Sequence, residues 1–215
     1  EYIEIQKYAF RKYKIKTVEN KHTHLVPEEL EQLERLSLTD KHMKLQKSLD
    51  AFLFCCYAGM RYSDFTNLSK KNIVDINQET WLIYKSVKTG TEVRLPLYLL
   101  FAGKGIVILN KYRNNLEDFF RLRDNSNINK DLIIIAKLAG LSKKISFHTA
   151  RHTNATLLIY NGVNITTVQK LLGHKSVKTT QVYTNIMDMT IVHDLEKIKQ
   201  AALGIKKKTD NSFNK

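Results

Sequence analysis

The sequence predicts a mainly α-helical domain with a small antiparallel β-sheet, an α+β fold, on the basis of three observations. Apolar residues recur at helical spacing along most of the chain from residue 25 onward. Segments 80–85 and 92–95 are rich in β-branched and aromatic residues and flank Lys88-Thr89-Gly90, a pattern typical of a hairpin with a glycine-containing turn. A chain of 215 residues with 43% hydrophobic content is also long enough for one well-buried core.

Two helices are predicted before the hairpin. The first begins at Pro27, where the missing amide would have had no partner, and two glutamates follow it at the positive end of the helix dipole. The second starts after Asp40 as its cap and ends at Gly59. Its many apolar residues predict a central place in the core. Lys88 is expected at or near the tip of the hairpin that comes next.

Five further helices are predicted after the hairpin from apolar periodicity and from breaks that include Gly140 and Asn161-Gly162. They span residues 131–139, 151–160, 165–172, 177–186 and 191–202. The predicted domain organisation is a linker or remnant over residues 1–24, one domain over residues 25–205, and a basic polar tail over residues 206–215.

The charge of the chain indicates a polyanionic partner. Lys and Arg number 35 against 21 Asp and Glu, which gives a net charge of +14. Nucleic acid is the first candidate. An anionic membrane is the second, but no apolar run approaches a transmembrane length and no secretory signal pattern is visible at the start. The adjacent Cys55 and Cys56 lie in an apolar helical run and are read as core residues of a reducing compartment, so a cytoplasmic location is expected.

The most informative stretch runs from His148 to Tyr183. His148 and Arg151 are one helical turn apart and should share a face, whereas His152 is expected on a different face, making a structural hydrogen bond. His174 follows a glycine at a predicted helix end. Phosphoryl transfer needs cations, a proton donor, a proton acceptor and an activated hydroxyl, and this chain offers a candidate for each.

Three residues upstream complete the candidate set. Arg61 follows the second helix, Asp64 is placed to hold its guanidinium one turn later, and Lys88 is carried by the hairpin. Taken singly, each has an ordinary structural explanation as a solvated side chain or a helix-end partner. The joint pattern, rather than any single residue, indicates a reactive site.

Five short segments occur in the same order as in a known family. They are Ala-Gly-Met-Arg-Tyr-Ser-Asp around Arg61, Lys-Thr-Gly at Lys88, His-Thr-Ala-Arg-His-Thr at His148, Leu-Leu-Gly-His at His174 and Thr-Thr-Gln-Val-Tyr at Tyr183. On these segments the chain resembles, from about residue 25 to about residue 200, the tyrosine recombinases, also called phage-type integrases. These segments are similar to those of integrases of bacterial mobile elements such as prophages and conjugative transposons.

The resemblance implies a site-specific DNA recombinase that breaks and rejoins double-stranded DNA. Tyr183 would attack the scissile phosphate to give a 3′-phosphotyrosyl intermediate, while Arg61 and Arg151 grip its non-bridging oxygens. Lys88 would protonate the leaving 5′-oxygen. The bond energy is conserved in the intermediate, so neither ATP nor any other cofactor is expected, and no cluster with metal-ligand spacing is visible.

The remaining implied roles belong to two histidines and an acid. His148 would accept the tyrosine proton, His174 would donate a hydrogen bond to the phosphate, and Asp64 would orient Arg61. Asn154 departs from the family, which commonly has a bulky apolar residue there, and this affects only the expected local packing.

Family members also carry an N-terminal core-binding domain that closes a clamp on DNA, and this chain looks like an isolated catalytic domain. Alone it is expected to be a monomer with weak DNA affinity. As part of a full-length protein it is expected to form a tetramer on DNA, associated with the bacterial nucleoid when active and assisted by DNA-bending accessory proteins. Segment 191–202 would then pack against a neighbouring subunit.

Two other readings stay open at this point. Segment 154–185 could form a helix-turn-helix with Gly162 in the turn, which would make the protein a non-enzymatic DNA-binding regulator. The regulator hypothesis explains the net charge but gives Arg61 and Lys88 no function. A type IB topoisomerase would use the same phosphotyrosine chemistry to relax supercoils, although the Leu-Leu-Gly-His segment favours a recombinase.

Overall fold

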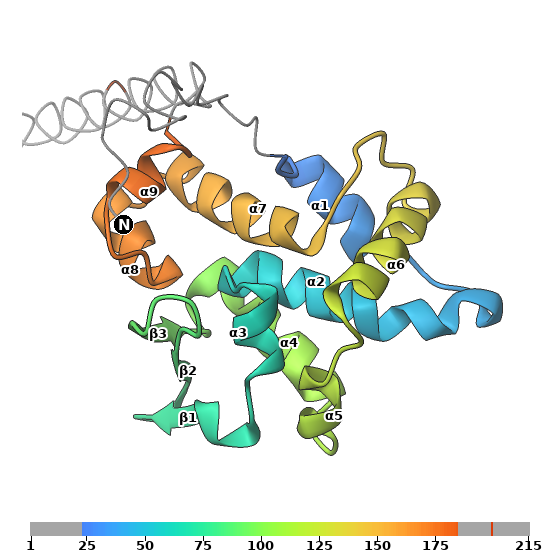
Figure 1. Ribbon diagram of the computed structural model, residues 1–215, viewed down its shortest axis with the longest axis horizontal. Helices are drawn as coiled ribbons and strands as arrows, with labels where there is room; N and C mark the ends of the chain where they lie inside the picture. Colours follow the sequence, from blue (N-terminus) through green and yellow to red (C-terminus); the bar gives the residue numbers. More distant parts are fainter. Residues whose placement is uncertain (1–22, 185–198, 200–215) are drawn as a thin grey trace, which may run out of the picture.

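Helix α2 (Gln46–Ala58) lies at the centre of the fold, because nearly all of its residues are buried. The computed structural model describes residues 23–184 and residue 199. Within it, α7 (Phe147–Tyr160) packs along α2 and is buried over most of its length as well (Figure 1). Cys55 and Cys56 are free thiols inside this core, as the sequence predicts.

Shorter helices surround this central pair. They are α1 (Pro27–Glu34), the 3₁₀ turn η2 (Asp40–Leu45), α3 (Tyr62–Thr66), the 3₁₀ turns η3 (Lys70–Asn72) and η4 (Leu100–Gly103), α4 (Lys104–Lys111), α5 (Leu116–Phe120) and α6 (Asn125–Leu138). Phe65 of α3 makes edge-on contacts with Phe119 and Phe120 of α5, at 5.3 and 5.5 Å between ring centroids. These aromatic contacts join α3 to the core.

The sheet contains three antiparallel strands in the order β1-β2-β3. They are β1 (Ile73–Ile76), β2 (Glu79–Lys85) and β3 (Glu92–Pro96), and Tyr84 of β2 pairs with Val93 of β3. The β2–β3 turn projects toward α8 (Ile165–Leu172), which is followed by the short α9 (Lys178–Gln181) (Figure 1).

Gly173 ends α8 at the point where β3 approaches it. Its φ is +63°, and a Cβ there would come within 2.6 Å of Val93 Cγ2. Both the left-handed backbone and the close approach therefore require glycine at this position.

The structure confirms the predicted mainly α fold with a small antiparallel sheet, with differences at the element ends. The helix predicted after Asp40 begins as a 3₁₀ turn and becomes an α-helix only at Gln46. The two helices predicted from residues 131 and 151 start earlier, at Asn125 and Phe147, because Asp124 and Ser146 supply N-terminal caps.

Several elements have no counterpart in the sequence analysis, namely β1 and helices α3, α4 and α5. The predicted helix 191–202, apart from residue 199, and the proposed tail 206–215 lie outside the described residues. Across the part of the chain that the structure describes, no helix is long and apolar enough to cross a membrane.

Candidate active site

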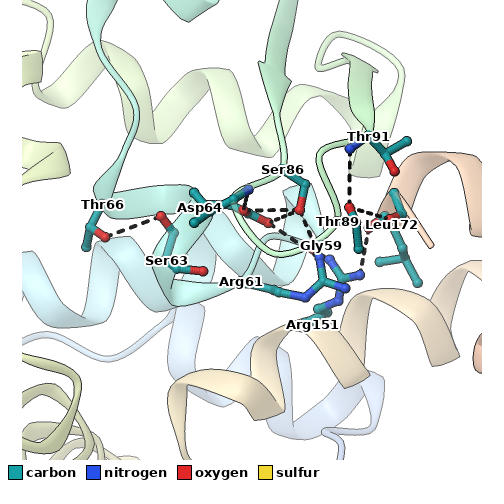
Figure 2. Close-up of polar contacts among 12 residues, drawn as sticks. Gly59, Arg61, Ser63, Asp64, Thr66, Ser86, Thr89, Thr91, Arg151 and Leu172 are labelled. Atoms are coloured by element: carbon teal, nitrogen blue, oxygen red, sulfur yellow. Dashed lines mark hydrogen bonds and ion pairs between the residues drawn. The ribbon is translucent and has the colours of Figure 1, made fainter. Parts of the chain in front are cut away.

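Arg61 lies where the chain passes from α2 into α3. Gly59 ends α2 with a φ of +66°, and Arg61 is the N-cap residue of α3. Its Nη1 donates to Ser86 Oγ at 3.3 Å and lies 3.5 Å from Asp64 Oδ2 (Figure 2). The guanidinium is thus directed toward the start of the β2–β3 turn.

The carboxylate of Asp64 contacts the β2–β3 turn as well as Arg61. This buried carboxylate accepts the backbone N–H of Val87 at 2.8 Å and the hydroxyl of Ser86 at 3.3 Å. The ion pair with Arg61 that the sequence predicts is present, but the carboxylate's shortest contact is with the hairpin. Asp64 therefore fixes the first residues of the turn relative to Arg61.

Lys88 is exposed in that turn, between two anchored neighbours. Val87 is held by Asp64 on one side, and on the other Thr89 Oγ1 donates to the carbonyl of Gly173 at 3.1 Å. The turn is closed by Gly90 N–H donating to Ser86 O at 2.8 Å. The backbone that carries Lys88 is consequently tied to α3 and to the end of α8.

Arg151 is the largest fully buried side chain of the site, with 1% of its surface exposed. Its Nη1 donates to Gly59 O at 2.7 Å and its Nη2 to Leu172 O at 2.6 Å (Figure 2). Both carbonyls lie at helix C-terminal ends, whose partial negative charge favours a cation. Arginine has five N–H donors, so three remain for other acceptors.

The guanidinium of Arg151 stays charged in this buried position. Burial first, and then the like charge of Arg61, lowers the pKa of Arg151 to about 10. That value is still well above neutral pH. Two cationic guanidinium groups are therefore close enough to influence each other, which is a favourable arrangement for binding an anion between them.

Tyr183 is buried just after α9, with 3% of its surface exposed. Its hydroxyl is 3.1 Å from Nδ1 of His152, and the two ring centroids are 5.5 Å apart. Burial raises the pKa of Tyr183, while Arg151 and Arg61 act in the opposite direction. The phenol is therefore protonated at neutral pH and needs a proton acceptor before it can attack.

The expectation that His152 faces away from His148 is wrong. The two residues are four apart on α7 and lie on the same face, with ring centroids 4.4 Å apart in an edge-to-face contact. His148 is exposed and His152 is buried between it and Tyr183. The expected structural hydrogen bond of His152 is therefore made to the candidate nucleophile itself.

His174 is a buried, neutral histidine. Its Nδ1 is 2.9 Å from Thr180 Oγ1. Burial first, followed by the positive charges of Arg151 and Arg61 and by His148, lowers the pKa of His174 from 6.5 to about 4. If the Thr180 hydroxyl donates to Nδ1, the other ring nitrogen carries the proton and can donate to a ligand.

This lowered pKa predicts a specific pH dependence of stability. Between pH 6.5 and about 4 the unfolded chain binds a proton at His174 that the folded chain does not. The free energy of unfolding should therefore fall as the pH falls through that window, by at most about 3 kcal/mol from this group. Denaturant titrations of wild type and His174→Asn at pH 7, 6, 5 and 4 check this; parallel curves would contradict it.

Asn154 links α7 to the end of α2. Its Nδ2 donates to the carbonyls of Cys56 and Tyr57, each at 2.9 Å, and only 2% of the residue is exposed. A Cβ on Gly59 would lie 2.6 Å from Asn154 Oδ1. The sequence suggested a matter of local packing here, but the structure shows a polar link to the turn that leads into Arg61.

We expect Asn154→Leu to lower the free energy of unfolding by about 2 to 4 kcal/mol, because it leaves two buried carbonyls without their donor. Urea unfolding followed by circular dichroism measures this. Asn161→Leu at the end of the same helix is the comparison, since its Nδ2 donates to Leu157 O of its own helix and the residue is exposed. Equal losses in the two variants would contradict the role given to Asn154.

Five of the residues predicted from the sequence lie within electrostatic reach of one another. Arg61, Arg151 and His148 all influence the pKa of His174, and both arginines influence that of Tyr183. The sequence analysis missed Ser86, Thr89 and Thr180, which hold these groups in place. Within the described residues there is no cluster of His, Cys, Asp and Glu that could hold a metal ion.

A helical domain whose small sheet delivers a lysine-bearing turn to two arginines and a buried tyrosine is the fold of a tyrosine recombinase catalytic domain. The chain belongs to the phage integrase family, whose model matches residues 24–189. The roles of the individual site residues remain predictions.

Known relatives and structures agree with this membership. The chain is 50% identical over 171 residues to the tyrosine recombinase XerD of Bifidobacterium longum, covering 72% of this chain and 54% of the relative. It is similar to the crystal structure of XerA recombinase, with a TM-score of 0.64 and 25% identity over 83% of this chain and 66% of that one. A lambda integrase dimer bound to a COC′ core site shares the fold, with a TM-score of 0.63 and 19% identity, over 80% of this chain and 62% of that one. The chain spans about half the length of the curated relatives it matches.

Proposed function

We propose that residues 25–205 form the catalytic domain of a site-specific DNA recombinase that cleaves through a 3′-phosphotyrosyl intermediate. The observation that carries this proposal is the placement of Tyr183 beside His152 within the electrostatic reach of Arg61 and Arg151. A phosphodiester bound between the two guanidinium groups would meet a tyrosine hydroxyl already paired with a histidine.

In this mechanism the arginines neutralise the non-bridging oxygens while Tyr183 Oη forms a bond to phosphorus and the bond to the 5′-oxygen breaks. Arg151 reaches the phosphate with the N–H groups that Gly59 and Leu172 leave free. His174 donates a further hydrogen bond from the ring nitrogen opposite Thr180. The resemblance assigns the acceptance of the Tyr183 proton to His148. Religation reverses the step on another strand.

DNA is the partner that the net charge of +14 favours. The lambda integrase neighbour is itself bound to its core site as a dimer, which supports the proposal of DNA binding and self-association. We propose that it works as a tetramer, in the bacterial cytoplasm and on the nucleoid, with DNA-bending accessory proteins. The 191–202 segment supplies subunit contacts.

The test is a search for a covalent protein–DNA adduct. The chain is incubated at low salt with nicked duplexes of randomised sequence, so that no recognition site has to be assumed, and detergent-resistant complexes are isolated and sequenced. A cleaved strand attached through its 3′-phosphate is expected. An adduct on the 5′ side, or a folded chain that yields none, would contradict the proposal, and the latter result is the one a helix-turn-helix regulator would give. Strand exchange between two labelled duplexes separates a recombinase from a topoisomerase.

Lys88→Ala should slow cleavage of the selected duplex by about 10²–10⁴-fold, because the leaving 5′-oxygen loses its proton donor. A duplex with a bridging 5′-sulfur has a thiolate leaving group that barely needs protonation, so the variant should cleave it at nearly the wild-type rate. Single-turnover rates on both substrates measure this. Lys85→Ala, at the exposed end of β2, is the matched control. An equal loss on both substrates would exclude the general-acid role.

A further inference from the structure

The hydrogen bond between Tyr183 and His152 bears on which residue accepts the proton of Tyr183. The family resemblance gives that role to His148. The hydroxyl of Tyr183 lies 3.1 Å from His152 Nδ1, within the range required of a group that removes its proton. The imidazole ring of His148 lies against that of His152, with the ring centroids 4.4 Å apart in edge-to-face contact.

The surroundings of the pair favour proton transfer between its members. Tyr183 has 3% and His152 has 7% of its surface exposed, so bulk water has little access to the phenol. Loss of the phenol proton leaves a negative charge that Arg61 and Arg151 stabilise. A positioned acceptor at hydrogen-bond distance is therefore the missing component, and His152 occupies that place.

The placement of His152 on α7 also explains why it stays at this distance. It is the residue directly after Arg151, whose guanidinium is fixed by carbonyls of α2 and α8, and it precedes Thr153, whose hydroxyl accepts the backbone N–H of Leu25. Helix α7 is thus held on both sides of His152. The imidazole ring of His152 lies between the rings of His148 and Tyr183.

We propose that His152 is a catalytic residue that accepts the Tyr183 proton as the nucleophile attacks, an inference that rests on the proposed function. The Tyr183 O–H bond breaks and its proton moves to Nδ1 of His152, while Oη bonds to phosphorus and the 5′-oxygen leaves with a proton from Lys88. In religation His152 returns the proton to the departing tyrosine. His148 positions the imidazole by its edge-to-face contact.

The experiment combines replacement of the proposed proton acceptor, His152, with a more acidic phenol at position 183. His152→Gln keeps a hydrogen-bonding side chain but cannot take a proton at working pH, and it should lower the single-turnover cleavage rate by about 10²-fold or more. Incorporation of 3,5-difluorotyrosine at position 183, a more acidic phenol, should restore most of that loss. The matched variant His148→Gln should lose less activity and gain no comparable rescue.

The rescue ratio within each background does not depend on how much of the variant is folded, and His152→Asn serves as the second variant if His152→Gln folds poorly. Rescue in His148→Gln but not in His152→Gln would overturn the assignment, as would a wild-type rate in His152→Gln. A wild-type chain that forms no adduct would instead contradict the proposed function itself. A wild-type adduct with no effect at residue 152 would overturn this inference alone.

Discussion

Tyr183→Phe is expected to abolish the covalent adduct, lowering single-turnover cleavage on the order of 10³-fold or more, because the variant lacks the oxygen that bonds to phosphorus. The ring, its burial and its contact with His152 remain. Loss of one hydrogen bond should cost only about 1 kcal/mol of stability. DNA affinity, measured by fluorescence anisotropy at fixed salt, should stay close to that of the wild type.

Tyr84→Phe provides the matched control. Tyr84 is also a buried tyrosine close to the arginines, with 5% of its surface exposed, but its hydroxyl has no hydrogen-bond partner in the described structure. Its replacement should therefore leave adduct formation intact and the stability unchanged or slightly higher. An adduct that persists in Tyr183→Phe would mean that a different side chain is the nucleophile.

The fold was predictable where a local pattern determined it. The β-branched and aromatic residues on either side of Lys88-Thr89-Gly90 indicated strands β2 and β3, and Gly59 and Gly173 marked helix ends that need a left-handed backbone. Helix α3 was missed because it has only five residues, too few to show periodicity, and it is held by aromatic contacts with distant segments. Strand β1 likewise depends on its pairing with β2.

The site residues are likewise of two kinds. Some belong to short segments that can be recognised in the sequence, and others hold those residues in place. Arg61 and Arg151 could be recognised from short segments, but their orientation depends on partners far away in sequence. Asn154 reaches back from α7 to α2, and Ser86 lies between Arg61 and Asp64. Nothing in the sequence near these polar residues indicates such contacts. The spacing of four between His148 and His152 was an available signal, and it was interpreted incorrectly.

Arg151→Lys is expected to lower the cleavage rate on the order of 10²-fold or more and to lower the free energy of unfolding by about 2 to 4 kcal/mol. The guanidinium joins Gly59 O and Leu172 O, the ends of two helices, and has planar N–H groups left for a phosphate. A lysine ammonium is a point donor without this fork, so it cannot hold both carbonyls and the substrate in the same geometry. The catalytic and structural losses therefore have a common origin.

Two measurements separate these losses. Arg35→Lys, at an exposed ion pair on α1, should change neither quantity appreciably and controls for the exchange of cations. A duplex with a methylphosphonate at the cleaved position carries no charge there, so Arg151→Lys should lose less activity on it, relative to wild type, than on the ordinary phosphate. If the loss is the same on both duplexes, Arg151 acts by holding α2 to α8 and not by neutralising the phosphate.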